Sequence, residues 1–376
     1  MSSFSRDSLS SVRRIVVKVG SALLSDPDAG LDRQMIEQLA AQLAGLMAAD
    51  KEVVLVSSGA VAEGCARLGW KQRPTRVHQL QAAAAVGQMG LVQAYESALG
   101  EFRRATAMIM LTHDDLADRQ RYLNARGTLN QLLEQGVVPV INENDTVATE
   151  EIRFGDNDTL AALVANLLEA DILVILTDVE GLLDADPRHQ PDARRIPQAA
   201  AMDSDLDALP SADAGVLGRG GMVTKLRAAR LASRSGAHTL IADGRAEDVL
   251  MRLLGGEDLG TLLTAELSPL TARKRWIAGQ LRAKGDVVVD SGAAAALTMQ
   301  GVSLLAVGVS AVRGEFQRGD VVRICTQNNR ALAQGLSNYD SATLRRLAGV
   351  RTEDFAQILD MPGEPEVVHR DNLVLV

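Results

Sequence analysis

Two lysines occupy sequence settings in which a cation could act on phosphate. Lys18 lies inside the apolar run VVKVG, and Lys225 closes a glycine-rich stretch at residues 215–225. A lysine in an apolar strand is costly unless its charge meets a partner. Glycines before a helix let backbone N–H groups approach phosphates. Two cations and a group of backbone donors would therefore suit a polyphosphate.

Each setting also has a purely structural interpretation. Lys18 could lie on an edge strand, with its aliphatic stem over apolar surface and its ammonium group in water. The glycine-rich stretch could be a flexible surface loop. Taken one at a time, the two settings support the structural and functional interpretations about equally.

A polar cluster is formed by two segments, NEND at residues 142–145 and FGDND at residues 154–158. Asn, Asp and Gly are usual turn formers, and Asp158 could begin a helix, so composition alone favours a structural role. The alternative is a pocket for a zwitterionic amino acid. Carboxylates suit an ammonium group, whereas amides and backbone donors suit a carboxylate.

Several common site motifs are missing from the chain. It contains no GxxxxGK[ST] loop, no GxGxxG after a strand, no HExxH and no GxSxG, and its five histidines are scattered without metal-ligand spacing. The P-loop, zinc and serine-hydrolase interpretations therefore lose support together.

The elements that must position these residues alternate along the chain. Apolar runs without polar alternation predict strands buried on both faces, and segments with helical spacing lie between them. The predicted strands are residues 15–19, 53–56, 107–111, 137–141, 172–176 and 239–242, and the helices are residues 33–47, 79–99, 122–134, 159–168 and 222–235. This order predicts an α/β fold with a mainly parallel sheet sandwiched by helices.

Small or polar residues follow nearly every predicted strand. Ser57-Ser58-Gly59 and Thr177-Asp178 are two examples, and each could also be ordinary loop punctuation. In open parallel sheets, ligands bind beyond the carboxyl ends of the strands. We therefore expect these loops to face one crevice, which is the candidate active site.

The character of the chain changes after Leu263. Short apolar runs separated by turn residues predict a small, mostly β second domain. The predicted organisation is a large domain at residues 1–263, a linker at residues 264–281 and a second domain at residues 282–376.

Composition is that of a soluble globular protein, with 47% hydrophobic and 23% charged residues among 376. Two distant cysteines, Cys65 and Cys325, fit a reducing compartment, and no apolar run approaches a membrane span. The N-terminus is polar and carries no apolar signal region, so we expect a cytoplasmic protein with no membrane contact. A net charge of −9 would repel anionic substrates, so local cations and N–H groups must bind them.

Taken together, the motifs resemble the amino acid kinase family with a C-terminal PUA domain. The resemblance covers nearly the whole chain from Ile15, and the segment from Val137 is its most specific part. The matching segments are VVKVGS, VSSGAVAEG, VVPVINENDTVATEEIRFGDND, LTDVEGLLDADPR, GRGGMVTKL, RKRWI and GDVVVDSGAAAAL.

Within the family, the segments are most similar to members that act on free glutamate. The resemblance implies transfer of phosphate from ATP, with Mg²⁺, to the γ-carboxylate of L-glutamate, giving L-glutamyl 5-phosphate in the first step of proline biosynthesis. It also suggests a homo-oligomer, and feedback inhibition by proline is a hypothesis.

The resemblance assigns roles to individual residues. The catalytic residues are Lys18, Lys225 and Asp158. The glutamate-binding residues are Ser58, Asp145 and Asn157, supported by Asn142 and Asp156. The nucleotide-binding residues are Lys18, Thr177, Asp178, Arg219, Gly220, Gly221, Met222, Val223, Thr224 and Lys225. No protein ligand of the metal is assigned. The family often has Thr where Ser57 stands and a smaller residue near Arg219, and both positions are expected to lie close to ligands.

Two alternatives remain open at this point. The acceptor could be acetylglutamate, aspartate or a nucleotide, although the segments at 142–145 and 155–158 favour free glutamate. The second domain could bind RNA, as PUA domains often do. Residues 271–376 hold 13 Lys/Arg and 11 Asp/Glu, a net of +2, which favours a structural or oligomer-forming role.

Overall fold

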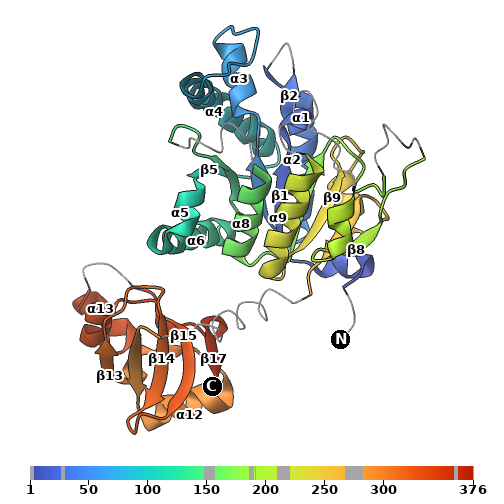
Figure 1. The fold of residues 1–376 in the computed structure, drawn as a ribbon. Helices are drawn as coiled ribbons and strands as arrows, with labels where there is room; N and C mark the ends of the chain where they lie inside the picture. Colours follow the sequence, from blue (N-terminus) through green and yellow to red (C-terminus); the bar gives the residue numbers. More distant parts are fainter. Residues whose placement is uncertain are drawn as a thin grey trace. The chain divides into compact units, whose positions relative to one another are not determined.

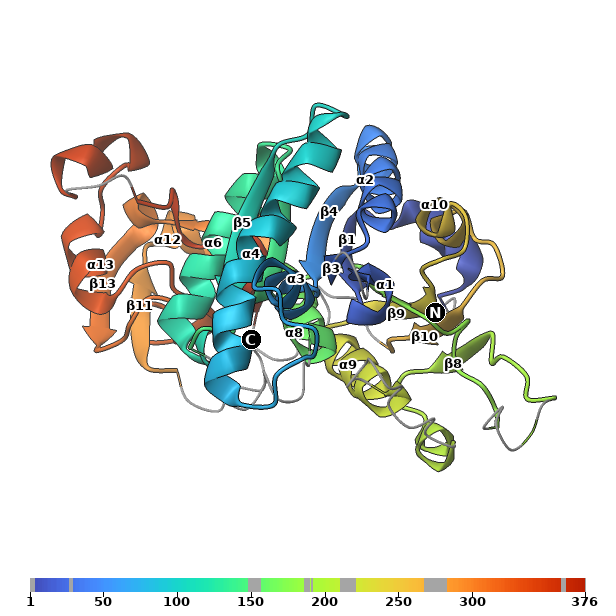
Figure 2. The ribbon, with the colours of Figure 1, turned by 90° about the horizontal axis from the view of Figure 1, so that it is seen from above.

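The structure, a computed structural model, describes residues 4–26, 30–147, 157–185, 190, 192–209, 221–266, 283–359 and 363–375. The chain divides into two compact units, Met1–Pro269 and Leu270–Val376. The first unit contains a large sheet covered by helices on both faces, and the second contains a smaller sheet (Figures 1 and 2).

Eight strands form the large sheet of the first unit. They are β1 (Arg14–Val19), β4 (Glu52–Ser57), β5 (Thr106–Leu111), β6 (Val138–Glu143), β7 (Ile172–Thr177), β8 (Gln198–Ala200), β9 (His238–Asp243) and β10 (Thr261–Thr264). Their order across the sheet is β5-β6-β4-β1-β7-β9-β10-β8. All neighbours pair in parallel except β9 and β10, which are antiparallel. The predicted mainly parallel sheet is thus confirmed.

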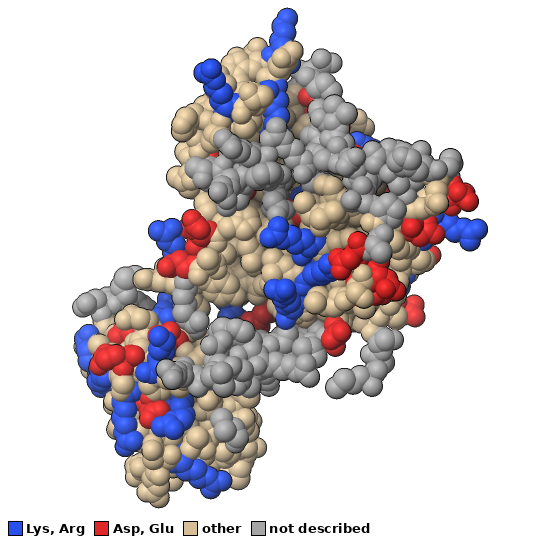
Figure 3. Space-filling view, in the orientation of Figure 1, with Lys and Arg blue, Asp and Glu red and all other residues tan. Residues whose placement is uncertain are grey.

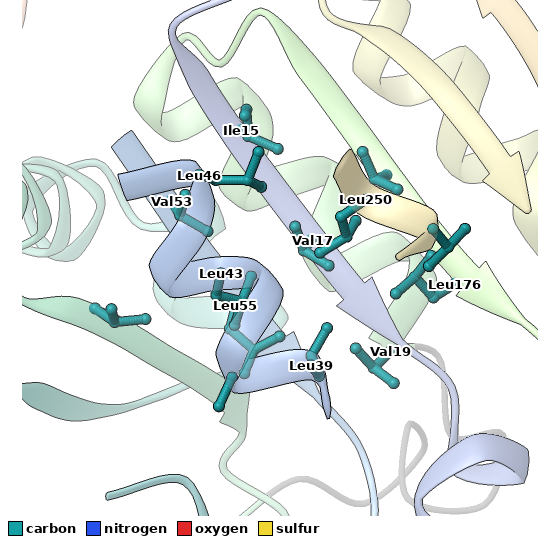
Figure 4. Close-up of a cluster of buried hydrophobic side chains, with 14 of the residues drawn as sticks. Ile15, Val17, Val19, Leu39, Leu43, Leu46, Val53, Leu55, Leu176 and Leu250 are labelled. Carbon is teal, nitrogen blue, oxygen red and sulfur yellow. The ribbon is translucent and has the colours of Figure 1, made fainter. Parts of the chain in front are cut away.

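Long helices pack on both faces of this sheet. Their bounds are α2 Arg33–Ala48, α4 Val77–Gly100, α6 Arg119–Glu134, α8 Asn157–Leu168, α9 Met222–Arg234 and α10 Val249–Leu254. The helices α2, α4 and α10 share an apolar core with Ile15, Val17 and Val19 of β1. Figure 4 shows the contribution of α2 and α10 to this core beside β1. The helices α6, α8 and α9 share a second core with Val16 on the opposite face. Because side chains alternate along a strand, Lys18 points to the face that α8 and α9 cover.

Shorter elements complete the first unit. They are η1 Arg6–Ser11, α1 Ser21–Leu24, β2 Ser25–Asp26, β3 Gly30–Leu31, α3 Ala60–Arg67, α5 His113–Ala117 and η2 Ser204–Ala208. None of these, nor β8 and β10, was predicted from the sequence. Among the described residues, no helix is long and apolar enough to cross a membrane.

The predicted strands and helices of the first unit are all present, with small shifts at their ends. One expectation was wrong. The strand β5 is mostly half-buried, because it lies at an edge of the sheet and has a neighbour on one side only. The last strand, β10, includes Thr264, so the sheet continues just past Leu263, where the predicted linker begins.

The helices α3 and α4 approach each other through two glycines. A Cβ atom added at Gly64 would overlap the backbone of Ala83, and one added at Gly87 would overlap the backbone of Ala60. Only glycine allows two helix backbones to lie this close. The crossing therefore fixes α3, whose first turn follows β4, against the middle of α4.

We expect Gly87→Ala to lower the free energy of unfolding by about 3 kcal/mol, because the added methyl group meets backbone that cannot rotate away. Gly127→Ala in α6 is the matched control, since no atom lies within 4 Å of its added Cβ. Alanine has the higher helix propensity, so this control should gain about 0.5–1 kcal/mol. Denaturant unfolding of both variants measures the difference, and equal stabilities would contradict the packing argument.

The second unit is built on a five-stranded sheet with the order β13-β11-β14-β15-β17. Its elements are β11 Gly285–Val289, α12 Ser291–Gln300, β12 Leu304–Leu305, η3 Ala306–Gly308, β13 Val309–Gly314, β14 Val321–Thr326, β15 Ala331–Leu336, α13 Ser341–Leu347, η4 Thr352–Gln357, β16 Glu366–Val368, η5 Arg370–Asn372 and β17 Leu373–Leu375. Val287, Ile324 and Phe355 belong to its separate apolar core. The mostly β prediction is confirmed, although the sequence reasoning missed α12 and α13.

Candidate active site

Both lysines singled out by the sequence meet one buried carboxylate. Lys18 Nζ lies 2.6 Å from Asp158 Oδ1, and Lys225 Nζ lies 3.4 Å from Asp158 Oδ2. Lys18 comes from the end of β1, Asp158 from the first turn of α8 and Lys225 from the first turns of α9. Their exposed fractions are 5%, 2% and 6%. The edge-strand alternative for Lys18 is excluded, because β1 lies in the middle of the sheet.

Charge compensation explains how three ionisable groups can be buried together. Burial alone would raise the pKa of Asp158, but the two lysine charges and hydrogen bonds from Lys18 and Thr224 lower it to about 2. Burial lowers the pKa of Lys225, while the charge of Asp158 opposes that change. The carboxylate is therefore ionised at neutral pH and holds two ammonium groups at the same edge of the sheet.

The first turn of α9 adds further polar groups to this cluster. Gly221 is the N-cap residue, and Thr224 Oγ1 donates to Asp158 Oδ2 at 2.8 Å. Met222 and Val223 lie in the same turn, and Val223 is exposed. The helix start carries the unpaired N–H groups and partial positive charge that favour a bound anion. With the two lysines beside it, this edge suits the phosphates of a nucleotide.

The end of β7 lies close to Lys225. Thr177 is buried and donates from Oγ1 to Asp178 Oδ1 at 3.2 Å, whereas Asp178 is exposed. The negative charge of Asp178 is one of the groups that act on the pKa of Lys225. The assignment of Thr177 and Asp178 to nucleotide binding stays a prediction.

A polar cavity opens next to the lysine cluster. Its lining residues are Ser21, Ser25, Ser58, Gly59, Ala60, Val61, Ala62, Arg73, Asn142, Glu143, Asp145 and Asn157. Most come from the ends of β4 and β6 and from the first turns of α3 and α8, while Ser21 and Ser25 follow β1 and Arg73 lies between α3 and α4. Polar loops after different strands thus meet at one site, as expected for the carboxyl edge of a parallel sheet.

Hydrogen bonds give this cavity a donor side. Asn157 Nδ2 donates to Ser58 Oγ at 3.0 Å, so the Ser58 hydroxyl keeps its own hydrogen to donate. Gly59 has a φ of 108° and precedes the first turn of α3, whose backbone N–H groups are also donors. Hydroxyl and backbone donors at a helix start suit a carboxylate.

Carboxylates form the acceptor side of the cavity. Glu143 is buried and lies 3.3 Å from His113 Nδ1, measured from Oε1. Burial and the nearby charge of Glu143 raise the pKa of Asp145 to about 7, while Arg73 acts in the opposite direction. A cationic ligand would favour ionised Asp145. The cavity thus has groups for both ends of a zwitterion.

Asn157 and Asp158 join the two halves of the site. These neighbours occupy the first turn of α8, and one lines the cavity while the other pairs with both lysines. An acceptor molecule in the cavity would consequently lie beside a phosphate held by the lysines.

Most of the predicted site residues that the structure describes fall in this region. Asp156, Arg219 and Gly220 lie outside the described residues. Ser57 does not line the cavity, although its neighbour Ser58 does, and its expected closeness to a ligand stays a prediction. The Ser57 hydroxyl is fully buried, donates to the carbonyl oxygen of Ser58 and lies 3.0 Å from the Tyr95 hydroxyl.

Sequence reasoning missed several functional candidates. Glu143 stood inside the NEND segment but was not singled out. Arg73 carried no signal, because it lies on the connection between α3 and α4 and enters the cavity only through the fold. Gln88, in the middle of α4, was missed as well, because only the fold brings it into contact with Asn142 of the cavity.

Comparison with known proteins agrees with this geometry. Residues 13–243 match the amino acid kinase family, and residues 285–359 match the PUA domain. The chain therefore belongs to the amino acid kinase family, as the motifs indicated.

Within the family, the chain is similar to proteins named glutamate 5-kinase. Those of Pseudomonas syringae pv. syringae (strain B728a) and Pseudomonas aeruginosa (strain UCBPP-PA14) are each 58% identical to it over 371 residues. These alignments cover 99% of this chain and 100% of each relative. Among solved structures, the UMP kinase of Bacillus anthracis has 16% identity and a TM-score of 0.47, covering 68% of this chain and 97% of that one.

Proposed function

We propose that this chain transfers the γ-phosphoryl group of ATP to the γ-carboxylate of L-glutamate and releases L-glutamyl 5-phosphate and ADP. This reaction is the first step of proline biosynthesis. The proposal depends on one observation, which is that Asn157 and Asp158 are neighbours. Asn157 lines a cavity with groups for a zwitterion, and Asp158 lies between two lysines. The glutamate 5-kinase names of relatives that match the full chain support the same substrate.

The chemistry needs no general base. A glutamate side chain has a pKa of about 4.3, so its carboxylate is already ionised at neutral pH. One carboxylate oxygen attacks the γ-phosphorus, the bond from that phosphorus to the bridging oxygen breaks, and ADP leaves with the electron pair. Such transfers depend mainly on positioning and on stabilising charge at the phosphoryl oxygens. Lys18 and Lys225 would provide that charge from two sides.

ATP and Mg²⁺ fit the described residues in different ways. Lys18, Lys225 and the first turn of α9 provide the cations and N–H donors that polyphosphates require. No group of three His, Cys, Asp or Glu side chains suited to a metal occurs among the described residues. Mg²⁺ in kinases takes many of its ligands from phosphates and water, where it neutralises developing charge. We therefore propose that it enters with the nucleotide.

Trapping the acyl phosphate tests this function. The protein is incubated with ATP, Mg²⁺, L-glutamate and hydroxylamine, and each component is omitted in turn. We expect a hydroxamate only in the complete mixture. ADP release with acetylglutamate, aspartate and nucleotide acceptors forms the second arm, and selective turnover of any of these would reject glutamate as the substrate.

Glutamate binding should depend on pH through Asp145. Its pKa of about 7 in the free protein means that the ammonium group of glutamate must displace a proton below that pH. We expect KM for glutamate to rise about tenfold from pH 8 to pH 6. Asp145→Asn should have a higher KM that is flat over this range, and Asp114→Asn, at an exposed position of α5, should behave like the parent protein.

Stability gives an independent check on the same group. The folded-state pKa of Asp145 is raised, so the folded protein holds a proton between pH 4 and 7 that the unfolded chain releases. The contribution of Asp145 to the free energy of unfolding therefore falls as pH rises through that window. Asp145→Asn should therefore raise Tm at pH 8 more than at pH 5, and an equal change at both values would contradict the raised pKa.

A structural or oligomer-forming role is proposed for the second unit. This role fits its surface, because several arginines there pair with carboxylates. Arg323 binds Asp286 through two hydrogen bonds of 2.7 and 2.8 Å. Figure 3 shows both charge signs on the visible face of this unit. RNA binding is not favoured, and homo-oligomerisation, proline inhibition, the predicted domain limits and a cytoplasmic location stay predictions.

A further inference from the structure

Gln88 is a polar side chain buried behind the candidate glutamate cavity. It lies in the middle of α4, is 8% exposed and follows Gly87, whose backbone touches α3. It does not line the cavity, but it contacts a residue that does. The glycine crossing beside it leaves no space for α4 to shift toward α3.

Hydrogen bonds define the orientation of the amide that Gln88 contacts. The backbone N–H of Glu143 donates to Asn142 Oδ1 at 2.9 Å, so this oxygen must be the acceptor. The amide nitrogen of Asn142 must then donate, and it does so to Gln88 Oε1 at 2.9 Å. Gln88 Nε2 points to Met108 Sδ at 3.2 Å.

Three acceptors, one of them on Asn142, determine the orientation of Asn157. Asn157 Nδ2 has three acceptors within reach, the carbonyl oxygen of Ser57 at 3.0 Å, Ser58 Oγ at 3.0 Å and Asn142 Oδ1 at 3.1 Å. The nitrogen is therefore directed into the protein. The amide group that can face the cavity is the oxygen, Oδ1, which is an acceptor.

We propose that Gln88 is a positioning residue for substrate selection. Through Asn142, which provides one of the three acceptors of Asn157 Nδ2, it helps to hold Asn157 in the orientation that presents an acceptor oxygen to the ammonium group of the amino acid. We call Gln88, Asn142 and Asn157 the amide chain. The inference rests on the proposed function and adds a residue that does not touch the substrate. Without the Gln88 acceptor, Asn142 would rotate to find another partner for its Nδ2, and Asn157 would lose one of the acceptors that direct its nitrogen into the protein. An Asn157 side chain that turned over would present an N–H donor to a cation.

Glutarate, which is glutamate without the amino group, tests the amide chain. We measure KM for glutamate and the competitive inhibition constant of glutarate at saturating ATP, and compare their ratio. Gln88→Met removes the acceptor of Asn142 while keeping a long apolar side chain. We expect KM for glutamate to rise about 10- to 100-fold, as for a lost hydrogen bond to a charged group, with the glutarate constant unchanged.

Two further variants make the test specific. Gln88→Glu keeps an oxygen that accepts from Asn142 in either protonation state, so it should retain most of the parental ratio. Gln93→Met, on the exposed side of α4, should retain all of it. If Gln88→Met does not fold, Gln88→Ala removes the same acceptor without adding a group near Met108.

A parallel rise of both constants in Gln88→Met would overturn the inference, because a merely loosened cavity weakens both ligands. An unchanged ratio would overturn it as well. These outcomes differ from failure of the proposed function, in which the unmodified protein forms no hydroxamate from glutamate.

Discussion

We expect Lys225→Ala to lower kcat by about 10²- to 10³-fold, with a much smaller change in stability. Loss of one preorganised group that stabilises transition-state charge typically has this effect on the chemical step. The fold tolerates the change because Asp158 keeps Lys18 at 2.6 Å and the Thr224 hydroxyl at 2.8 Å. Steady-state kinetics with glutamate and ATP, together with thermal unfolding, measures both effects.

Arg227→Ala is the matched control for this variant. Arg227 lies on the same helix, two residues further along, and is exposed to solvent. Its removal deletes one positive charge from α9 but none from the buried cluster, so kcat should stay within about twofold of the parent value. A fully active Lys225→Ala protein would remove this lysine from the mechanism.

Asp158→Asn should impair both activity and folding. A neutral amide cannot balance two ammonium groups that lie 2.6 and 3.4 Å from the original carboxylate oxygens. Removing one partner of a buried ion pair typically costs about 3–5 kcal/mol, because an uncompensated charge is left behind. We also expect kcat to fall by at least about 10²-fold, since neither lysine would keep its position.

The pH dependence of this variant follows from the lysines. Burial already lowers the pKa of Lys225, and loss of the opposing Asp158 charge lowers it further. In the unfolded chain, Lys225 has a pKa of about 10.4 and keeps its proton up to that pH. In the folded variant, it releases the proton at a lower pH. Stability of Asp158→Asn should therefore rise from pH 7 to pH 9. In the parent protein, the contribution of ionised Asp158 is lost as pH falls from about 4 to about 2.

A double variant separates the charge effect from a packing effect. Adding Lys18→Met to Asp158→Asn removes one of the two unbalanced cations, so stability should recover at pH 7 while activity stays low. Denaturant unfolding of the single and double variants makes the comparison. If the double variant were no more stable than Asp158→Asn, the loss would be due to packing, and the electrostatic account of this cluster would be wrong.

The sequence by itself predicted six of the eight strands of the large sheet, the helices between them along the chain, and the places where chemistry could occur. Apolar runs of strand length separated by helical spacing specify a parallel α/β unit, because buried strands and amphipathic helices have different periods. Polar residues that directly follow predicted strands, such as Ser58, Asn142 and Thr177, indicate its ligand-binding edge, because parallel strands place their carboxyl ends together.

Only the tertiary structure decided how distant residues combine. Lys18 and Lys225 lie near opposite ends of the sequence of the first unit. The order of the strands in the sheet brings both lysines to Asp158. The pKa of Asp145 depends on burial and on Glu143, which no local pattern encodes. Gln88 has no local sequence feature that sets it apart, and its contact with Asn142 joins the middle of α4 to the end of β6. Local periodicity specifies elements, whereas contacts between elements depend on how the whole chain packs.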